Sequence, residues 1–137
     1  MEKKEELQKK YMEMKMIEQQ VSHVQNHLKL MEQQMEELMG TIQGLDEFQS
    51  LEDGSEMLVP LNNGIFTKGT LKKGNKLLIN VGADVVVEKS VDGTKDLLHK
   101  QLEELKESQI ELVNQLQQIV HYATNLEQEI AALAKQV

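Results

Sequence analysis

Two long heptad stripes, one at each end of the chain, constrain this 137-residue sequence more than any other feature. In both stripes apolar residues alternate spacings of four and three, which is the a/d pattern of a coiled coil. Only Gln109 interrupts the second stripe, at a position where a polar residue more often sets pairing or register than chemistry. The first stripe is Leu7, Tyr11, Met14, Ile17, Val21, Val24, Leu28, Met31, Met35, Leu38, Ile42 and Leu45. The second is Leu98, Leu102, Leu105, Gln109, Leu112, Leu116, Ile119, Ala123, Leu126, Ile130, Leu133 and Val137.

The two stripes have nearly equal lengths, so we expect the arms to pack against each other, antiparallel, within one chain. Two spacings of three in succession, at Tyr11, Met14 and Ile17, predict a stammer that overwinds the coil locally. Gly40 and Gly44 lie at outer positions near the end of the first arm, where glycine disfavours helix. A looser final turn is the expected consequence.

The middle of the chain has a different pattern. Short runs rich in β-branched residues alternate with turn residues, and an Asn-Gly pair at Asn63 and Gly64 is a strong hairpin signal. The sequence therefore predicts two successive hairpins, with strands at residues 57–61, 65–71, 76–81 and 85–89. Pro60 lacks an amide hydrogen, so it is expected at a strand edge, a strand start or a bulge. Ser90 can cap the returning helix, whose first turn contains Asp92.

The predicted fold is α+β and mainly α: a long antiparallel two-helix coiled coil with two β-hairpins between the helices. Its parts are a helix at 1–50, a double hairpin at 51–89 and a returning helix at 90–137. Isolated hairpins are marginal in water and their edges invite pairing, so we expect hairpins of several chains to join in an oligomeric β-barrel. The residues expected to serve this assembly are Leu58, Val59, Leu61, Ile65, Phe66, Leu71, Leu77, Ile79, Val81, Val85 and Val87.

Composition excludes several classes of protein. Aromatic residues make up 3% of the chain, too little for an ordinary globular core. The net charge is −8, and all fifteen cationic residues are lysines dispersed among 23 acids, which argues against nucleic acid as a partner. The chain has no cysteine, and neither a signal peptide nor an apolar run of membrane-spanning length is evident. These features predict a cytoplasmic protein that does not bind membranes.

No motif supports catalysis, a cofactor or a metal. Residues 69–76 have the glycine spacing of a phosphate-binding loop, but Asn75 follows the second glycine where that motif needs lysine. His23 and His27 could share a helix face, yet they flank the heptad stripe and no third ligand is near them in sequence. We therefore expect a protein that is not an enzyme and that holds no cofactor.

The distal ends of the arms are the candidate binding region. Seven of the eight methionines lie in the first arm, and flexible, polarizable methionine suits surfaces that adapt to many apolar partners. Local opening also costs least at coil ends, so seam residues there can become available to a ligand. The residues expected to form this tip are Leu7, Tyr11, Met12, Met14, Met16, Leu126, Ile130, Leu133 and Val137.

The middle block resembles that of alpha-class prefoldin subunits, and with the flanking heptads the resemblance covers nearly the whole chain. Beta-class subunits have one hairpin, so the second hairpin indicates the alpha class. The chain departs from the family at Gly93-Thr94, where relatives usually continue with helix formers. The segments that carry the resemblance are Leu58-Val59-Pro60-Leu61, Ile65-Phe66-Thr67-Lys68-Gly69-Thr70-Leu71, Ile79-Asn80-Val81-Gly82-Ala83-Asp84 and Val87-Glu88-Lys89-Ser90.

The resemblance implies a hexamer of two alpha-class and four beta-class subunits. It also implies an ATP-independent holdase, a chaperone that captures non-native or nascent proteins at the coil tips and delivers them to a group II chaperonin. The alternative is a structural or scaffolding coiled coil, such as a subunit of a prefoldin-like complex or a filament, without transfer of clients.

Overall fold

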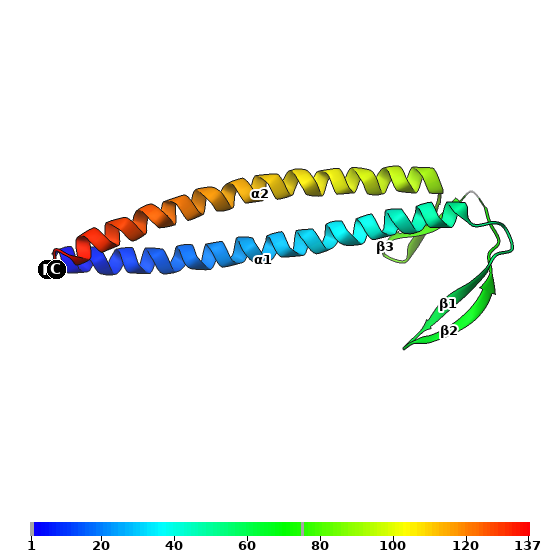
Figure 1. The fold of residues 1–137 in the computed structure, drawn as a ribbon, viewed down its shortest axis with the longest axis horizontal. Helices are drawn as coiled ribbons and strands as arrows, with labels where there is room; N and C mark the ends of the chain where they lie inside the picture. The colour runs from blue at the N-terminus through cyan, green and yellow to red at the C-terminus, as the bar shows by residue number, and fades with distance from the viewer. Residues whose placement is uncertain (1, 75) are drawn as a thin grey trace. The chain divides into compact units, whose positions relative to one another are not determined.

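The computed structural model describes residues 2–74 and 76–137, and it confirms the predicted fold of two long helices with two hairpins between them (Figure 1). The elements in chain order are α1 (Glu2–Ser50), β1 (Glu56–Asn62), β2 (Ile65–Thr70), β3 (Lys76–Gly82), β4 (Val85–Ser90) and α2 (Val91–Ala134). The chain divides into two compact units. We call residues 2–36 with 103–137 the distal coil, and residues 37–102 the hairpin part.

In the distal coil, α1 and α2 run antiparallel with their apolar stripes facing each other. Ile17, Leu126 and Ile130 form a buried cluster, and Leu126 is only 3% exposed. Leu7, Met14, Val21, Ile119 and Ala123 are half-buried and pack against this cluster. The stripe predicted from the sequence is therefore the core of this unit.

The predicted stammer is wrong. Tyr11 is 55% exposed, whereas Lys10 is half-buried and stands in the seam between Leu7 and Met14. The buried series thus keeps alternating spacings of three and four back to Leu7, as an undisturbed heptad repeat requires. Lysine can do this because its aliphatic stem covers apolar surface while its ammonium reaches out to Glu129, 2.9 Å away.

In the hairpin part, α1 continues as helix through both glycines to Ser50, so the looser final turn is not seen. Ile42, Val91, Thr94 and Leu102 are buried there. Polar side chains join the two helices next to this apolar contact. Gln49 donates a hydrogen bond to Asp92 (3.0 Å) and accepts one from Lys95 (3.0 Å), and Lys95 also pairs with Asp46.

Lys73, in the link between the hairpins, completes the end of α1. The last turn of α1 has no basic residue of its own, although a cation is favourable at a helix C-terminus. The Lys73 ammonium supplies it by donating hydrogen bonds to the carbonyl oxygens of Gln49 (2.8 Å) and Leu51. The Lys73 amide also donates to the Asp53 carboxylate (2.7 Å). One residue therefore ties the link between hairpins to the helix that precedes them.

The two hairpins have the same strand pairing. In the first, β1 pairs with β2 from Glu56↔Thr70 to Asn62↔Ile65, and Leu61 is an extra, bulged residue. In the second, β3 pairs with β4 from Lys76↔Ser90 to Gly82↔Val85, and Val81 is bulged. Every pair of the second hairpin is a pair of the first shifted by 20 residues. The hairpins are thus an internal repeat in backbone geometry, although their side chains differ.

The loops repeat as well. Both central residues of each turn have positive φ: 50° and 78° at Asn63 and Gly64, and 50° and 60° at Ala83 and Asp84. These values suit the twist of a two-residue hairpin turn, for which Asn-Gly is a preferred sequence. Ala83 is not a residue that favours this region of φ. The second turn is therefore the less favourable of two equivalent turns.

The start of α2 shows what Gly93 does at the helix N-terminus. The amide of Gly93 donates to the Ser90 hydroxyl (3.0 Å), which confirms Ser90 as the N-cap. A Cβ atom at position 93 would lie 2.9 Å from that hydroxyl oxygen. Gly93 therefore leaves room for the Ser90 cap. Helix α2 begins at Val91, directly after Ser90.

Candidate functional site: the grooves of the distal coil and the open faces of the hairpins

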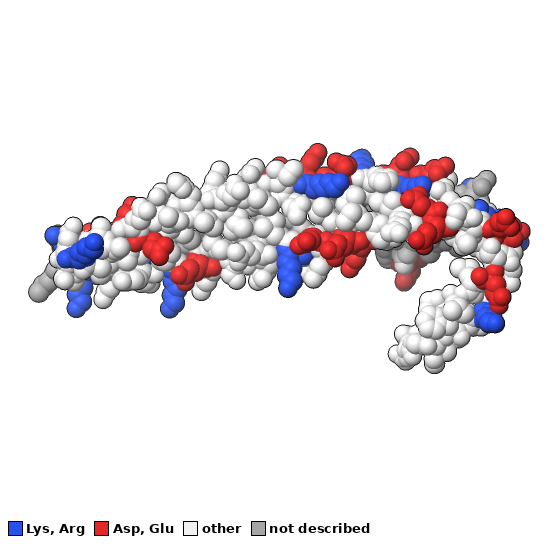
Figure 2. All heavy atoms as spheres, viewed as in Figure 1, with Lys and Arg blue, Asp and Glu red and all other residues white. Residues whose placement is uncertain are grey.

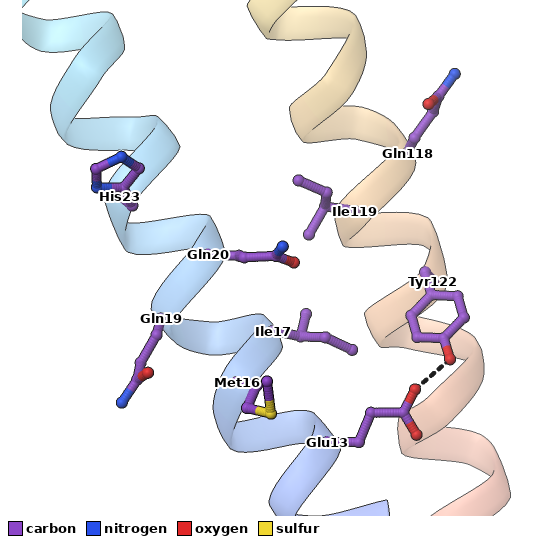
Figure 3. Close-up of a pocket in the computed structure, with 9 residues that line it drawn as sticks. All are labelled: Glu13, Met16, Ile17, Gln19, Gln20, His23, Gln118, Ile119 and Tyr122. Atoms are coloured by element: carbon purple, nitrogen blue, oxygen red, sulfur yellow. Dashed lines mark hydrogen bonds between the residues drawn. The ribbon is translucent and has the colours of Figure 1, made fainter.

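A groove of about 780 Å³ runs along one side of the distal coil between α1 and α2 (Figure 3). Ile17 of α1 and Ile119 of α2 point toward each other and form its floor. Met16 stands at its α1 side and is 68% exposed, and Tyr122 lines the α2 side. The residues that line the groove are Glu13, Met16, Ile17, Gln19, Gln20, His23, Gln118, Ile119 and Tyr122.

This lining is suited to apolar ligands. The floor is aliphatic, and a thioether and a phenol ring at the sides can adapt to aliphatic or aromatic groups. The Gln19 and Gln118 side chains point away from the space between the helices (Figure 3), and Glu13 is the one acidic side chain in the lining. The groove can therefore accept apolar groups without specific hydrogen bonding.

Two polar contacts join the helices beside the apolar cluster. Tyr122 donates a hydrogen bond to the Glu13 carboxylate at the edge of the groove (Figure 3), and this bond raises the pKa of the Tyr122 phenol. Lys10 donates to Glu129 at 2.9 Å, and that hydrogen bond raises the pKa of the Lys10 ammonium. Both contacts favour the closed arrangement of the helices at neutral pH, since each needs the protonated donor.

A second groove of about 700 Å³ lies between the same helices. Its α2 side carries small residues, Ala123, Ala131 and Ala134, so the helix surface is hollowed there. Tyr11 and Met14 of α1 line the opposite side. The exclusion of Tyr11 from the seam therefore places an exposed aromatic ring at the border of this groove.

The structure distributes the predicted tip residues over three environments. Leu126 and Ile130 are buried in the central cluster, and Ile130 also reaches the second groove. Leu7, Met14 and Leu133 are half-buried. Tyr11, Met12, Met16 and Val137 are exposed. The last group is the most accessible while the helices are paired, and Met14 and Ile130 are reached only through the second groove.

Several residues that line the grooves were not predicted from the sequence. Ile17 and Ile119 were assigned to the seam alone, and Tyr122 and Gln20 were not considered. Tyr122 directly precedes the seam residue Ala123 and is 52% exposed, so it flanks the seam rather than entering it. An aromatic residue at such a flanking position was the signal that could have revealed the groove.

The hairpins present apolar side chains on both of their faces. Leu77, Ile79 and Val87 share one face, and Leu78 and Val86 share the other with Glu88. We call the face of Leu78 and Val86, and the equivalent face of the first hairpin, the open face. In β3–β4 the open face carries Lys76, Leu78, Val86 and Glu88. In β1–β2 it carries Glu56, Leu58, Phe66 and Lys68. Most of the first hairpin is free of charge in Figure 2, where charged residues lie mainly near its root.

Most residues predicted for assembly are exposed in the single chain: Leu58, Val59, Leu61, Ile65, Phe66, Val81, Val85 and Val87. Leu71, Leu77 and Ile79 are half-buried. Leu78, which is 73% exposed, and Val86 were not predicted for assembly, although they stand together on the other face of the second hairpin. The face of Leu78 and Val86 is therefore left exposed by the described residues, whereas Leu77 and Ile79 on the other face are half-buried.

Two further features bear on the site. Among residues 2–74 and 76–137, no group of three or more side chains is placed to hold a metal ion, and His23 lines the first groove instead. Within the same residues, neither helix combines the length and apolarity needed to cross a membrane.

The fold and its exposed surfaces define a coiled-coil subunit that carries uncovered β-hairpins. Residues 17–136 match the family model described as prefoldin subunit. The chain belongs to the prefoldin family, in its alpha class. Prefoldins are chaperones rather than enzymes, and the family model and the relatives of this chain are described as subunits.

Relatives named prefoldin subunit alpha cover most of the chain. The protein of Thermofilum pendens is 30% identical over 86% of this chain and 92% of its own length. That of Archaeoglobus fulgidus is 27% identical over 96% of both chains. Among solved structures, the fold is similar to that of filamentous prefoldin from Methanocaldococcus jannaschii determined by cryo-EM, with a TM-score of 0.75, 15% identity, and coverage of 85% of this chain and 96% of the other.

Proposed function

We propose that this subunit forms a cytoplasmic, ATP-independent holdase with beta-class prefoldin subunits, two alpha with four beta. In this proposal the hairpins assemble the hexamer, the distal coils capture non-native proteins, and the captured client passes to a group II chaperonin. The observation that carries the proposal is the groove of about 780 Å³ on the distal coil, with exposed Met16 at its side.

The groove supports weak and adaptable capture. It is open to solvent between two exposed helices, and its floor consists of residues already packed in the buried cluster. An apolar side chain that enters it gains contact with Ile17, Ile119 and Met16 without unfolding the coil. One such contact is weak, but several coils of one oligomer that hold the same client raise the total affinity through effective concentration.

Opening of the coil end supplies a second mode of capture. Leu126 and Ile130 are buried while the helices are paired. The ends of α1 and α2 fray more readily than their middles, which exposes these residues to a client. Stepwise loss of such contacts allows release to a second chaperone, since no single contact holds the client.

A paired comparison of variants tests the capture site. Met16→Gln removes the exposed apolar side chain at the side of the first groove, and Ile110→Gln is the matched control, since Ile110 is similarly exposed but lines neither groove. Suppression of aggregation of a chemically denatured client is measured with each assembled oligomer. We expect a loss for the methionine variant alone. Equal activity of both variants and the wild type would reject capture at the groove.

The second candidate is a scaffold or filament without client transfer. It is supported by the uncovered hairpin faces, which suit self-assembly, and by the similarity of fold to a prefoldin that forms filaments. The mass of the chain alone and in a mixture with a beta-class subunit separates the candidates. The holdase predicts a discrete hetero-oligomer, and the scaffold predicts self-assembly that ignores the partner.

A further inference from the structure

The two hairpins carry the same charged pair in opposite order on their open faces. In the first hairpin Glu56 of β1 pairs with Lys68 of β2 at 3.7 Å. In the second, Lys76 of β3 pairs with Glu88 of β4 at 3.6 Å. These residues occupy equivalent positions of the 20-residue repeat, since Leu58 pairs with Lys68 and Leu78 pairs with Glu88. Geometry is conserved between the hairpins while the sign of each charge is exchanged.

The pairs contribute little to the hairpins themselves. All four side chains are largely exposed, and exposed ion pairs stabilise a fold only weakly. Net charge does not distinguish the hairpins either, because residues 56–70 and 76–90 each contain equal numbers of acids and lysines. The order of the charges is therefore a difference that the fold of the single chain does not require.

The order matters once the open face is covered. Leu58, next to Glu56 and Lys68, is 62% exposed, and Leu78 occupies the same place beside Lys76 and Glu88. A partner that covers these leucines also removes water from the adjacent charges. Coulombic interactions across the new interface then strengthen, and like charges brought together oppose docking.

We propose that the reversed order of acid and base makes the binding of each hairpin selective, so that a partner hairpin that binds β1–β2 does not bind β3–β4. The occupant of each open face is a β-hairpin of another prefoldin subunit with an apolar centre and an acid–base pair in the complementary order. This inference rests on the proposed assembly through hairpins. It adds a reason why two hairpins of the same backbone geometry do not exchange places in the oligomer.

Charge complementarity singles out this occupant. Whatever the docking geometry, replacing one hairpin by the other exchanges acid for base at both positions, so attraction becomes repulsion. An unfolded segment offers no fixed acid–base pair, and a helix can present one but has no backbone edge to pair with a strand. A second hairpin offers both, because its backbone can also pair with the strand edges that the isolated hairpins leave open.

The test reverses the order in one hairpin without changing its composition. Glu56→Lys with Lys68→Glu keeps the net charge and the ion pair, and Glu56→Gln with Lys68→Gln is the neutral control. Binding of the full chain to the beta-class subunit of the same organism is measured at ionic strengths of about 0.05 M and 0.5 M. Hydrogen exchange of the β1–β2 amides checks that the hairpin is still folded.

We expect the reversed variant to bind about tenfold or more weakly at low salt, the neutral variant to fall between it and wild type, and the differences to shrink at high salt. Lys76→Glu with Glu88→Lys should show the same trend. If wild type assembles and all variants bind with equal affinity, selectivity through charge order is overturned, and the proposed assembly through hairpins stands. No association of wild type with the beta-class subunit would overturn both.

Discussion

The distal coil buries its seam residues, whereas the hairpin part leaves many of its apolar residues exposed. In the distal coil, Ile17, Leu126 and Ile130 are buried between helices of the same chain. In the hairpin part, Leu58 and Leu78 stand on faces that residues 2–74 and 76–137 leave largely exposed. The first region is packed within a single chain, and in our proposal other chains complete the second. The difference would separate the two proposed tasks, since assembly could cover the hairpins and leave the coil ends free.

The most severe test of this contrast is the loss of a buried side chain from the distal coil. Leu126→Ala removes the least exposed apolar residue and should cost roughly 2–5 kcal/mol of the free energy of unfolding. Ile110→Ala, at an exposed position off the seam, should stay within about 0.5 kcal/mol of wild type. Circular dichroism at increasing denaturant measures both. Equal effects would show that the seam is not the core.

The hairpins should respond in the opposite sense. Leu58→Ser or Leu78→Ser should leave the unfolding of the isolated chain nearly unchanged and weaken association with the beta-class subunit by about 1.5–3 kcal/mol per leucine. Leu30→Ser, at a similarly exposed leucine of the distal coil, is the control and should not affect association. Analytical ultracentrifugation measures the affinities. Unimpaired association of the hairpin variants would contradict the assignment of these faces to assembly.

Substitutions of three helical glycines should change the free energy of unfolding by smaller amounts. A Cβ atom at Gly40 or Gly44 would meet no atom within 4 Å, so Gly40→Ala and Gly44→Ala should each stabilise α1 by about 0.5–1 kcal/mol. Gly93→Ala should not gain this amount, because its Cβ would crowd the Ser90 cap. Thermal unfolding of the three variants provides the measurement. A stabilising Gly93→Ala would refute the steric explanation.

Alkaline pH should have the smallest effect, and it should act on both units, since the bond to Asp46 also raises the pKa of Lys95 in the hairpin part. The folded state raises the pKa values of Lys10 and Tyr122 through their bonds to Glu129 and Glu13. Their contribution is complete below the unfolded pKa values near 10 and is lost as pH rises through the folded ones. The melting temperature should therefore fall at alkaline pH, and less so in Lys10→Met with Tyr122→Phe. An identical fall in that variant would contradict a role for these contacts.

Much of the fold followed from periodicity and turn residues. The alternating spacings of three and four predicted the seam residues of both helices, from Met14 in α1 to Leu133 in α2. Asn63-Gly64 predicted the first turn. Both predictions depend only on residues that are near each other in sequence. Lys10 was missed because a heptad search counts lysine as polar, although its stem packs as an apolar group. The bulges at Leu61 and Val81 were missed because a one-residue insertion leaves the composition of a strand unchanged.

The candidate site was less predictable than the fold. Burial of Leu126 and exposure of Met16 follow from the seam, but a groove depends on side-chain sizes on two helices at once. Tyr122 and the alanines at 123, 131 and 134 shape the grooves only because α2 lies antiparallel to α1 at a particular register. A single sequence does not state that register. The equivalence of the two hairpins was likewise visible only after strand pairing was known.

Photo-crosslinking within the assembled oligomer tests the division of tasks most directly. A photoreactive amino acid replaces Met16 at the side of the first groove or, in a second variant, Phe66 on the open face of the first hairpin. With an unfolded client present, we predict that position 16 crosslinks to the client and that position 66 crosslinks to a neighbouring subunit. Client crosslinks concentrated at position 66, with none at position 16, would contradict the account.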